Sequence, residues 1–208
     1  MKPRRSIARC HAVYSVKLRC GGYALLQTLD DTCRIAVFDE FRDNNDWKGF
    51  NLSAERVLFC CYVTKNFFRC SQIEKIKSVT ACDEIVFPNE SISLNVPVKV
   101  TLWQGTKQQR DVLIIGESIS LCKTTWIDGR PKLSYRKLHS RDYEKVKHLE
   151  LAGLRGYPEL NERLFLCRKS GRNVDPQKEI AFQRPLPPEF ETYVDIIGAL
   201  VSPSHFGY

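Results

Sequence analysis

Long apolar runs are absent from this chain. No stretch approaches the roughly 18 consecutive apolar residues of a membrane-spanning helix, so the sequence does not predict a membrane protein. The N-terminal segment MKPRRSIARCHAVYSVKL is basic, but charged residues interrupt its apolar part and no small-residue cleavage site follows. Because a signal peptide needs both features, we expect a cytoplasmic protein that binds no membrane.

Motifs that hold metals or phosphates are also missing. There is no CxxC or HxxxH pair, the spacings typical of structural zinc sites, and no glycine-rich phosphate loop with a Lys-Ser/Thr pair. The adjacent Cys60 and Cys61 would point to opposite faces of a strand and would not chelate one ion. We therefore expect neither a metal nor a cofactor.

The nine cysteines do not suggest a disulfide framework. Their number is odd, the chain of 208 residues is long, and most of them lie inside apolar runs. A free cysteine behaves as a small buried hydrophobe, and a reducing cytoplasm keeps it in that form. The sequence thus predicts reduced core thiols at Cys33, Cys60, Cys61, Cys122 and Cys167.

No group of residues forms a recognisable catalytic set. A reactive thiol needs a basic or polar environment, and these thiols lie among apolar residues, so no Cys–His pair is selected. The carboxylates of residues 30–43 lie in an expected turn and a polar loop, where acids are usually solvated. The sequence therefore predicts that the protein is not an enzyme.

Charge is moderate in sum and uneven along the chain. The chain has 32 Lys and Arg against 24 Asp and Glu, and the net charge of +8 attracts polyanions without specifying one. The first twenty residues are basic and contain no acid, whereas residues 30–46 carry six acids and two arginines. With 43% hydrophobic residues, the chain can still bury a core.

Short apolar runs separated by turn signals dominate the first two-thirds of the chain. The first three runs suit an antiparallel meander, because Gly21-Gly22 and Asp30-Asp31 are turn signals. The run VLFCCYV is apolar throughout and suits a strand covered on both faces. The segments expected to form strands are 11–17, 23–29, 34–38, 57–63, 96–103, 111–115 and 119–126.

Helical spacing replaces the strand patterns near Ser140. Apolar residues recur at helical intervals after this point, with Gly153 near the end, and Pro158 suits the first turn of a second helix. We predict an α+β fold with a mainly antiparallel, curved or barrel-like sheet and helices in the C-terminal third. Residues 1–168 would form a single β-rich domain, and residues 169–208 a linker and an extension that packs on it.

The polar stretch DEFRDNNDWKGFN, residues 39–51, is the candidate binding site. It is expected to be a loop, and loops concentrate binding residues. Alternatively, Phe41 and Trp47 fold back as a lid over the strand core. The candidate partner-binding residues are Asp39, Phe41, Asp43, Asp46, Trp47 and Phe50.

Nucleic-acid binding is the alternative function. Basic residues stand beside aromatic ones in the N-terminal arm, at Arg4, Arg5 and Arg9 near Tyr14, and again in KTTWIDGRPKLSYRKLHSR. A solvated face beside a core strand would give the same pattern, and the acidic stretch would repel phosphates. The sequence alone therefore disfavours a nucleic-acid partner.

Four segments in order resemble the immunity protein 26 family of bacterial polymorphic toxin systems. The first, YALLQTLDDTCRIAVFD, pairs two apolar strands, the second ending in Phe38-Asp39. VLFCCYV follows, and then the isoleucine-rich IEKIKSV leading to Pro88. The last segment, KHLELAGLRGYPELNERL, is similar to the family's C-terminal Leu-Glu and Glu-Arg-Leu pattern, and the resemblance spans residues 10–166.

The resemblance implies an immunity protein that binds and neutralises a cognate toxin C-terminal domain in the cytoplasm of the producing cell. It implies a monomer or a 1:1 heterodimer with the toxin and supplies no catalytic residues. The acids of residues 39–46 would pair with the basic groove of a nuclease toxin and speed capture. In the other arrangement, the basic N-terminal arm meets an acidic face of the toxin.

Overall fold

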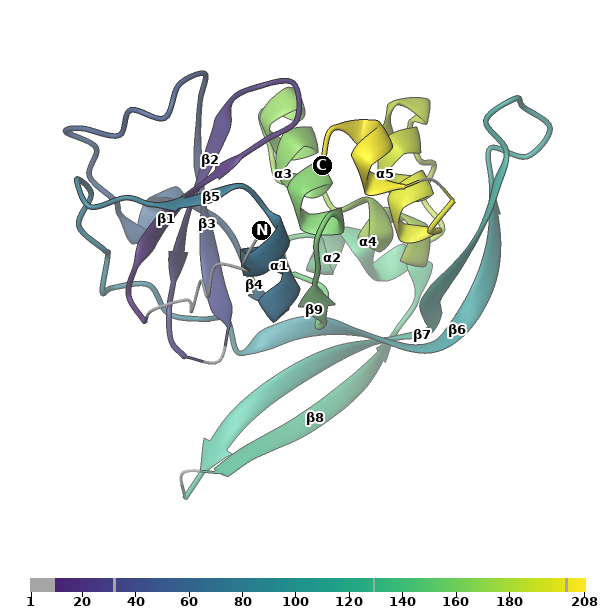
Figure 1. The fold of residues 1–208 in the computed structure, drawn as a ribbon. Helices are drawn as coiled ribbons and strands as arrows, with labels where there is room; N and C mark the ends of the chain where they lie inside the picture. The colour runs from purple at the N-terminus through teal and green to yellow at the C-terminus, as the bar shows by residue number, and fades with distance from the viewer. Residues whose placement is uncertain (1–9, 32, 129, 201) are drawn as a thin grey trace. The chain divides into compact units, whose positions relative to one another are not determined.

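A computed structural model describes residues 10–31, 33–128, 130–200 and 202–208 (Figure 1). The fold is α+β, with mainly antiparallel strands in curved sheets and most helices in the C-terminal part, so the predicted class is confirmed. Arg4, Arg5 and Arg9 of the N-terminal arm lie outside the described residues. Among the residues described, no helix is both long enough and apolar enough to cross a membrane.

The chain divides into two compact units. Unit 1 consists of Met1–Phe87, Leu154–Val174 and Val201–Tyr208, and unit 2 of Pro88–Gly153 and Asp175–Leu200. Neither unit is one continuous stretch of chain, so the units do not follow the expected division at residue 168.

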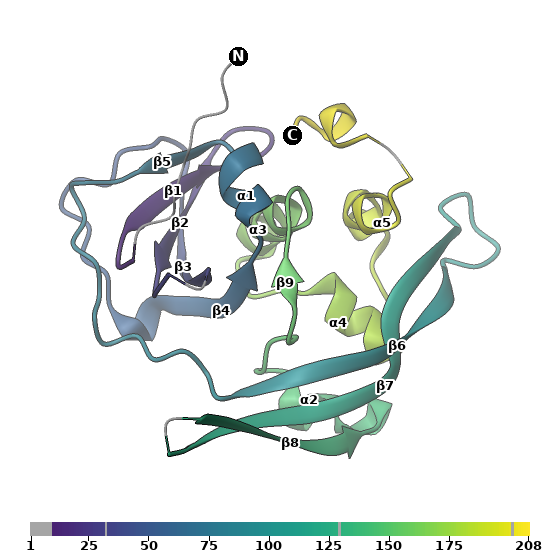
Figure 2. The same ribbon diagram turned by 60° about the horizontal axis from the view of Figure 1, so that its bottom comes forward.

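Unit 1 is built on a six-stranded sheet in the order β5-β1-β2-β3-β4-β9 (Figures 1 and 2). All neighbouring strands are antiparallel except β4 and β9, which run parallel. Apolar residues of β1 to β3 point into a core with the loop that follows β3, as period-2 strand patterns require. The strands are β1 (Val13–Lys17), β2 (Tyr23–Thr28), β3 (Arg34–Arg42), β4 (Val57–Val63), β5 (Ile73–Lys75) and β9 (Leu154–Arg155).

Unit 1 also contains the two α-helices α1 and α3. The short α1 (Lys65–Cys70), which sequence patterns did not predict, begins where the Thr64 hydroxyl accepts a hydrogen bond from the amide of Phe67. The second, α3 (Glu159–Ser170), starts after Pro158 as expected and ends at Gly171, whose φ of 64° favours glycine. Unit 1 also contains the 3₁₀ turns η1 (Ala54–Arg56) and η4 (Pro203–Phe206).

Unit 2 is built on a long three-stranded antiparallel sheet in the order β6-β7-β8, with β6 (Glu90–Leu102), β7 (Arg110–Ile127) and β8 (Arg130–Leu138). The two strands expected at 111–115 and 119–126 are in fact one, so that prediction is wrong. Gly116 lies between the two expected strands, and next to it the pairing of β7 with β6 shifts in register between Asn95 and Pro97. A glycine inside a strand often accompanies such a bulge without ending the strand.

The prediction of a helix from near Ser140 to near Gly153 is also wrong beyond its first turn. Helix α2 (Tyr143–Val146) stops early because the following segment pairs with β6: Ile92 donates to the carbonyl of Glu150 at 2.8 Å and accepts from the amide of Ala152 at 2.7 Å. This pairing satisfies backbone groups that a helix would have used internally. The remaining helices of unit 2 are η2 (Ser140–Asp142), α4 (Pro176–Ala181), η3 (Pro188–Phe190) and α5 (Glu191–Ile197).

The core of unit 2 lies between one face of the base of this sheet and the helices. Ile92, Ile119 and Leu138 of the three strands pack with Val146 of α2 and with Phe182, which follows α4. Phe182 meets the ring of Tyr143 edge-on at 5.4 Å. The base of the sheet is therefore covered, whereas β8 is exposed over all its residues except Leu138.

Candidate binding surfaces

The candidate binding stretch of residues 39–51 begins in a strand instead of a loop. Strand β3 continues to Arg42, so Asp39 and Phe41 are strand residues, which corrects the sequence prediction. The extension is held by β2, where Tyr23 pairs with Arg42 and Ala24 with Phe41 across a bulge. Only residues after Arg42 form the loop.

The aromatic residues of this stretch do not stand at the surface. Trp47 is 1% exposed and Phe50 is 7% exposed, and both belong to the core cluster of unit 1, while Phe41 is half-buried. The Trp47 indole donates to the Asn45 side-chain oxygen at 2.7 Å, and its ring meets Phe50 edge-on at 6.1 Å. Trp47 and Phe50 therefore anchor the loop and are not available as exposed contact residues.

The carboxylates of the stretch remain outside. Asp39, Asp43 and Asp46 are exposed, and we refer to these three residues as the acidic triplet. Asp43 forms an ion pair with Arg168 of α3, and the Asp46 carboxylate accepts a hydrogen bond from the amide of Lys48 at 3.1 Å. The surface therefore consists of three exposed carboxylates, one of them paired with Arg168, on β3 and on the loop that Trp47 and Phe50 anchor to the core.

A buried ion pair fastens α3 to the β1–β2 turn. The Glu162 carboxylate, fully buried, accepts two hydrogen bonds from the guanidinium of Arg19, at 2.6 Å from Nε and 2.9 Å from Nη2. Arg19 also lies 3.7 Å over the ring of Phe165. Burial lowers the pKa of Arg19, but its hydrogen bond to Glu162 and the charge of Glu162 outweigh this and raise it. The guanidinium therefore stays charged.

The hydroxyl of Tyr208 completes this arrangement by donating to the same carboxylate. Burial, with the charge of Glu162, raises the pKa of Tyr208 well above its ordinary value. The phenol thus stays protonated as the donor. This set of residues is structural, because each polar group is satisfied by another inside unit 1.

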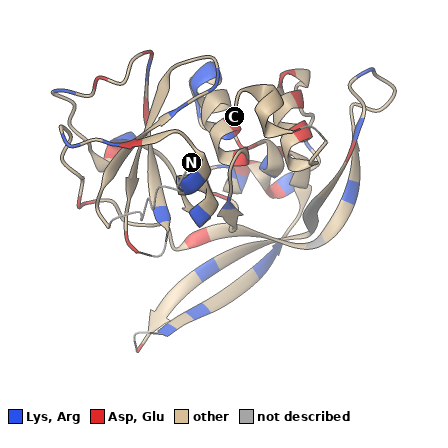
Figure 3. Ribbon diagram, in the orientation of Figure 1, with Lys and Arg blue, Asp and Glu red and all other residues tan. Residues whose placement is uncertain are grey.

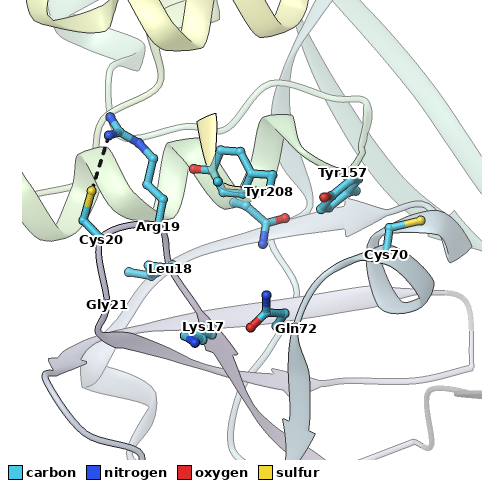
Figure 4. A pocket seen from close by; sticks show the side chains of 11 residues that line it. Lys17, Leu18, Arg19, Cys20, Gly21, Cys70, Gln72, Tyr157 and Tyr208 are labelled. Atoms are coloured by element: carbon cyan, nitrogen blue, oxygen red, sulfur yellow. Dashed lines mark hydrogen bonds between the residues drawn. The ribbon is translucent and has the colours of Figure 1, made fainter. Parts of the chain in front are cut away.

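A cavity of about 240 Å³ lies next to this network (Figure 4). It is smaller than the roughly 300–1,000 Å³ of ordinary small-molecule sites. The thiols of Cys20 and Cys70 line it with Tyr157 and Tyr208, but none of its eleven lining residues is a histidine. Arg19 Nη1 donates to the Cys20 thiol at 3.9 Å, and the lining residues include no Cys–His pair.

The cysteines divide by burial. Cys60, Cys61, Cys122 and Cys167 are buried as predicted, whereas Cys33 is only half-buried, which corrects the prediction for that residue. Within residues 10–31, 33–128, 130–200 and 202–208, no three His, Cys, Asp or Glu side chains gather closely enough to hold a metal ion.

A second charged surface lies in unit 2. Beyond Glu90, where β6 begins, residues 124–127 of β7 and 130–133 of β8 continue as a two-stranded ribbon (Figure 1). Residues 134–137 of β8 pair with residues 120–123 of β7, which β6 also borders, and we call residues 123–137 the β7–β8 arm. Its lysines and arginines form blue bands on both strands in Figure 3. Four of its large apolar side chains are more than half exposed: Trp126, Ile127, Leu133 and Tyr135.

Sequence patterns indicated the composition of this arm but missed strand β8. The segment RPKLSYRKL is too basic to resemble a strand with a buried face. The available signal was the Asp128-Gly129 pair between two β-forming runs, a typical two-residue hairpin turn. Asp128 indeed has a φ of 50°, as such turns need.

A family model described as Domain of unknown function (DUF8309) matches residues 4–184. The chain belongs to this family. The match covers all of Pro88–Gly153, so the β7–β8 arm lies inside the family's domain. Neither the curated proteins nor the solved structures contain a match to the chain.

Proposed function

We propose that this DUF8309 protein is an immunity protein that binds and neutralises a cognate bacterial toxin domain in the cytoplasm of the producing cell. One observation supports this function. The resemblance to the immunity protein 26 family spans residues 10–166, and its segments contribute β2, β3, β4, β5, β9 and the first part of α3 to unit 1, whereas residues 147–153 of the last segment and Pro88 belong to unit 2.

The Glu-Arg-Leu part of that pattern has a structural role. Glu162 binds Arg19, and Arg163, also fully buried, donates to the carbonyl of Val174 at 2.9 Å and lies 3.9 Å over the ring of Phe59. Leu164 is fully buried as well. The pattern thus describes how α3 is fixed in unit 1, and the residues that select a toxin must be sought on the surface.

The acidic triplet is the surface of unit 1 that fits a basic partner. Its three carboxylates are exposed, while Trp47 and Phe50 below them are fixed in the core. Such a preformed surface loses little conformational entropy on binding. Carboxylates facing the basic groove of a nuclease toxin would speed capture, and a standard interface of about 1,600 Å² would require no chemistry from this chain.

The test is co-expression with the toxin domain encoded next to this chain. We expect the wild type to restore growth and to co-purify with the toxin in a 1:1 complex. The triple variant Asp39→Lys, Asp43→Lys, Asp46→Lys should lose both effects, because three repulsive charges would face the toxin.

A matched control changes three exposed acids of unit 1 outside the triplet, namely Asp31→Lys, Asp83→Lys and Glu84→Lys. This variant should protect as well as the wild type, and thermal melting should show that both triple variants fold. If the wild type neither binds the toxin nor restores growth, the immunity function is wrong. If both variants lose protection equally, the acidic triplet is not the contact surface.

A further inference from the structure

The β7–β8 arm presents two faces of different chemistry. Its register is uninterrupted, so residues opposite one another share a face. On one face, Trp126 lies opposite Pro131, Leu133 opposite Thr124, and Tyr135 opposite Cys122. These cross-strand pairs repeat every two residues, so Trp126 and Tyr135 stand about 14 Å apart along the ribbon.

The other face of the arm is basic. Arg130, Lys132 and Arg136 lie opposite Ile127, Thr125 and Leu121, and Lys123 lies opposite Ser134. Residues 123–137 contain five Lys or Arg and one Asp. Lys123 pairs with Glu90 at 2.9 Å, but Arg130, Lys132, Arg136 and Lys137 have no ion-pair partner within the part of the chain that the structure describes.

This charge is available to an external anion on either side of the ribbon. Because β8 is an edge strand of the sheet, its long Lys and Arg side chains can reach round that edge from either face. Lys137 already lies on the aromatic face, opposite Ser120. A polyanion lying along the aromatic face would therefore meet positive charge along β8, which carries Arg130, Lys132, Arg136 and Lys137.

We infer that the β7–β8 arm binds single-stranded nucleic acid, with bases stacked on Trp126 and Tyr135 and phosphates held by Arg130, Lys132, Arg136 and Lys137. Aromatic rings that support bases, flanked by lysine and arginine, are the combination that single-strand binders use. This function is independent of toxin neutralisation, because the acidic triplet belongs to unit 1 and the arm to unit 2.

Other occupants fit the arm less well. A duplex hides the faces of its bases, so Trp126 and Tyr135 would find nothing to stack on, although a ribbon of two strands fits the major groove. A standard protein interface buries about 800 Å² on each partner around an apolar centre, and a narrow ribbon with a few apolar side chains lacks such a centre. Stacking needs only the exposed rings.

The first experiment measures binding of the full chain to labelled oligonucleotides of about 16 residues by fluorescence anisotropy. Single-stranded DNA, single-stranded RNA and duplex DNA of one mixed sequence are compared between about 50 and 200 mM salt. We expect both single strands to bind more tightly than the duplex, with affinity that falls linearly on a log–log plot against salt. Comparison of the two single strands shows whether the 2′-hydroxyl contributes.

Variants separate stacking from charge. Trp126→Ala should weaken binding about 5- to 150-fold and Trp126→Phe much less, because a base stacks on either ring. The triple variant Arg130→Ala, Lys132→Ala, Arg136→Ala should reduce the magnitude of the salt slope by about 2, since each phosphate contact on a single strand contributes about 0.7.

A control triple removes the same charge from unit 2 outside the arm: Lys99→Ala, Lys107→Ala and Arg141→Ala. It should leave the salt slope unchanged. The proposal is overturned if the wild type binds no single strand below about 0.1 mM. It is also overturned if the duplex binds more tightly, if Trp126→Ala has no effect, or if both triples lose affinity equally.

Two further outcomes would assign the arm to another partner and overturn the proposal. One is tighter binding to anionic lipid vesicles than to oligonucleotides. The other is loss of toxin capture by the arm variants without oligonucleotide binding by the wild type. Because the oligonucleotide assay contains no toxin, its failure leaves the immunity function standing, and failure of toxin neutralisation leaves this inference standing.

Discussion

Trp47 in unit 1 and Trp126 in unit 2 both occur in polar stretches of sequence beside basic residues, yet Trp47 is 1% exposed and Trp126 is 66% exposed. The loop around Trp47 folds onto the β1–β3 core, and Arg42 lies 4.8 Å over the buried ring. Around Trp126, β7 continues as a ribbon of two strands, with polar or exposed residues on both sides. A tryptophan in a polar stretch of sequence is thus part of the core in one unit and exposed in the other.

The largest expected effect tests that difference directly. Trp47→Ala should lower the free energy of unfolding by about 3–5 kcal/mol, because it removes a fully buried side chain and leaves a cavity. Trp126→Ala should change it by less than about 0.5 kcal/mol, because its ring is mostly solvated. Urea titrations of both variants measure the two values, and a large loss in Trp126→Ala would show that the arm is not a free surface.

The ion pairs of the two units should differ in the same direction. Glu162→Ala should cost about 3 kcal/mol, because it leaves the partly buried Arg19 without its carboxylate. In unit 2, Arg110 binds both Asp195 at 2.7 Å and Glu191 at 2.6 Å. Asp195→Ala should therefore cost only about 1 kcal/mol, because Glu191 remains as a partner.

Unfolding midpoints in urea give both costs from the same measurement. The exposed Glu144 serves as the control, and Glu144→Ala should leave the midpoint unchanged. If Asp195→Ala costs as much as Glu162→Ala, then Glu191 does not compensate for the loss of Asp195.

A smaller effect is expected at the β1–β2 turn. A Cβ atom at Gly22 would collide with the Arg168 guanidinium, which donates to the carbonyl of Gly21 and pairs with Asp43, whereas a Cβ at Gly21 meets nothing. Both glycines have a positive φ, so each change to alanine costs about 1 kcal/mol of backbone strain. Gly22→Ala should cost more than Gly21→Ala in thermal melting, and equal costs would show that Arg168 moves away freely.

The smallest effect concerns alkaline pH, where each unit has one tyrosine bonded to a glutamate. Burial and the neighbouring carboxylate raise the pKa of Tyr143 beside Glu179 and of Tyr208 beside Glu162. A raised pKa gives stability that is fully present below the unfolded value of about 10 and is lost as pH rises above it. The melting temperature should therefore fall between about pH 9 and pH 11.

The variant Tyr143→Phe, Tyr208→Phe isolates this effect. Its melting temperature should depend less on pH in the same range, although it starts lower because two hydrogen bonds are lost. An unchanged pH dependence would mean that neither phenol has a pKa in the folded state that differs from its pKa in the unfolded state.

The sequence was sufficient for elements whose residues bury themselves locally. Strands β1 to β4 follow apolar runs between turn signals, and α3 follows the proline at residue 158. Elements fixed by distant partners were missed. The residues after Val146 have helical spacing but pair with Ile92 of β6 instead of continuing the helix. Strand β8 buries little of its own surface and forms through its hydrogen bonds to β7.

The candidate site was predicted only in part for the same reason. The exposure of Asp39, Asp43 and Asp46 follows from their charge, which local sequence shows. The burial of Trp47 and Phe50 depends on contacts with Val13 and Leu25 in β1 and β2, and spacing along the chain cannot show that. The role of Asp39, Asp43 and Asp46 as partner contacts stays a prediction.

Because unit 1 consists of separate stretches of chain, its parts are synthesised at different times. Strand β9 and the helix that contributes Glu162 leave the ribosome only after the whole β6–β8 hairpin system has been made, on the order of ten seconds after β5. Throughout this interval the nascent sheet of unit 1 lacks its parallel edge strand β9, and Arg19 has no ion pair with Glu162. A chain stopped at Gly153 should accordingly aggregate or be degraded.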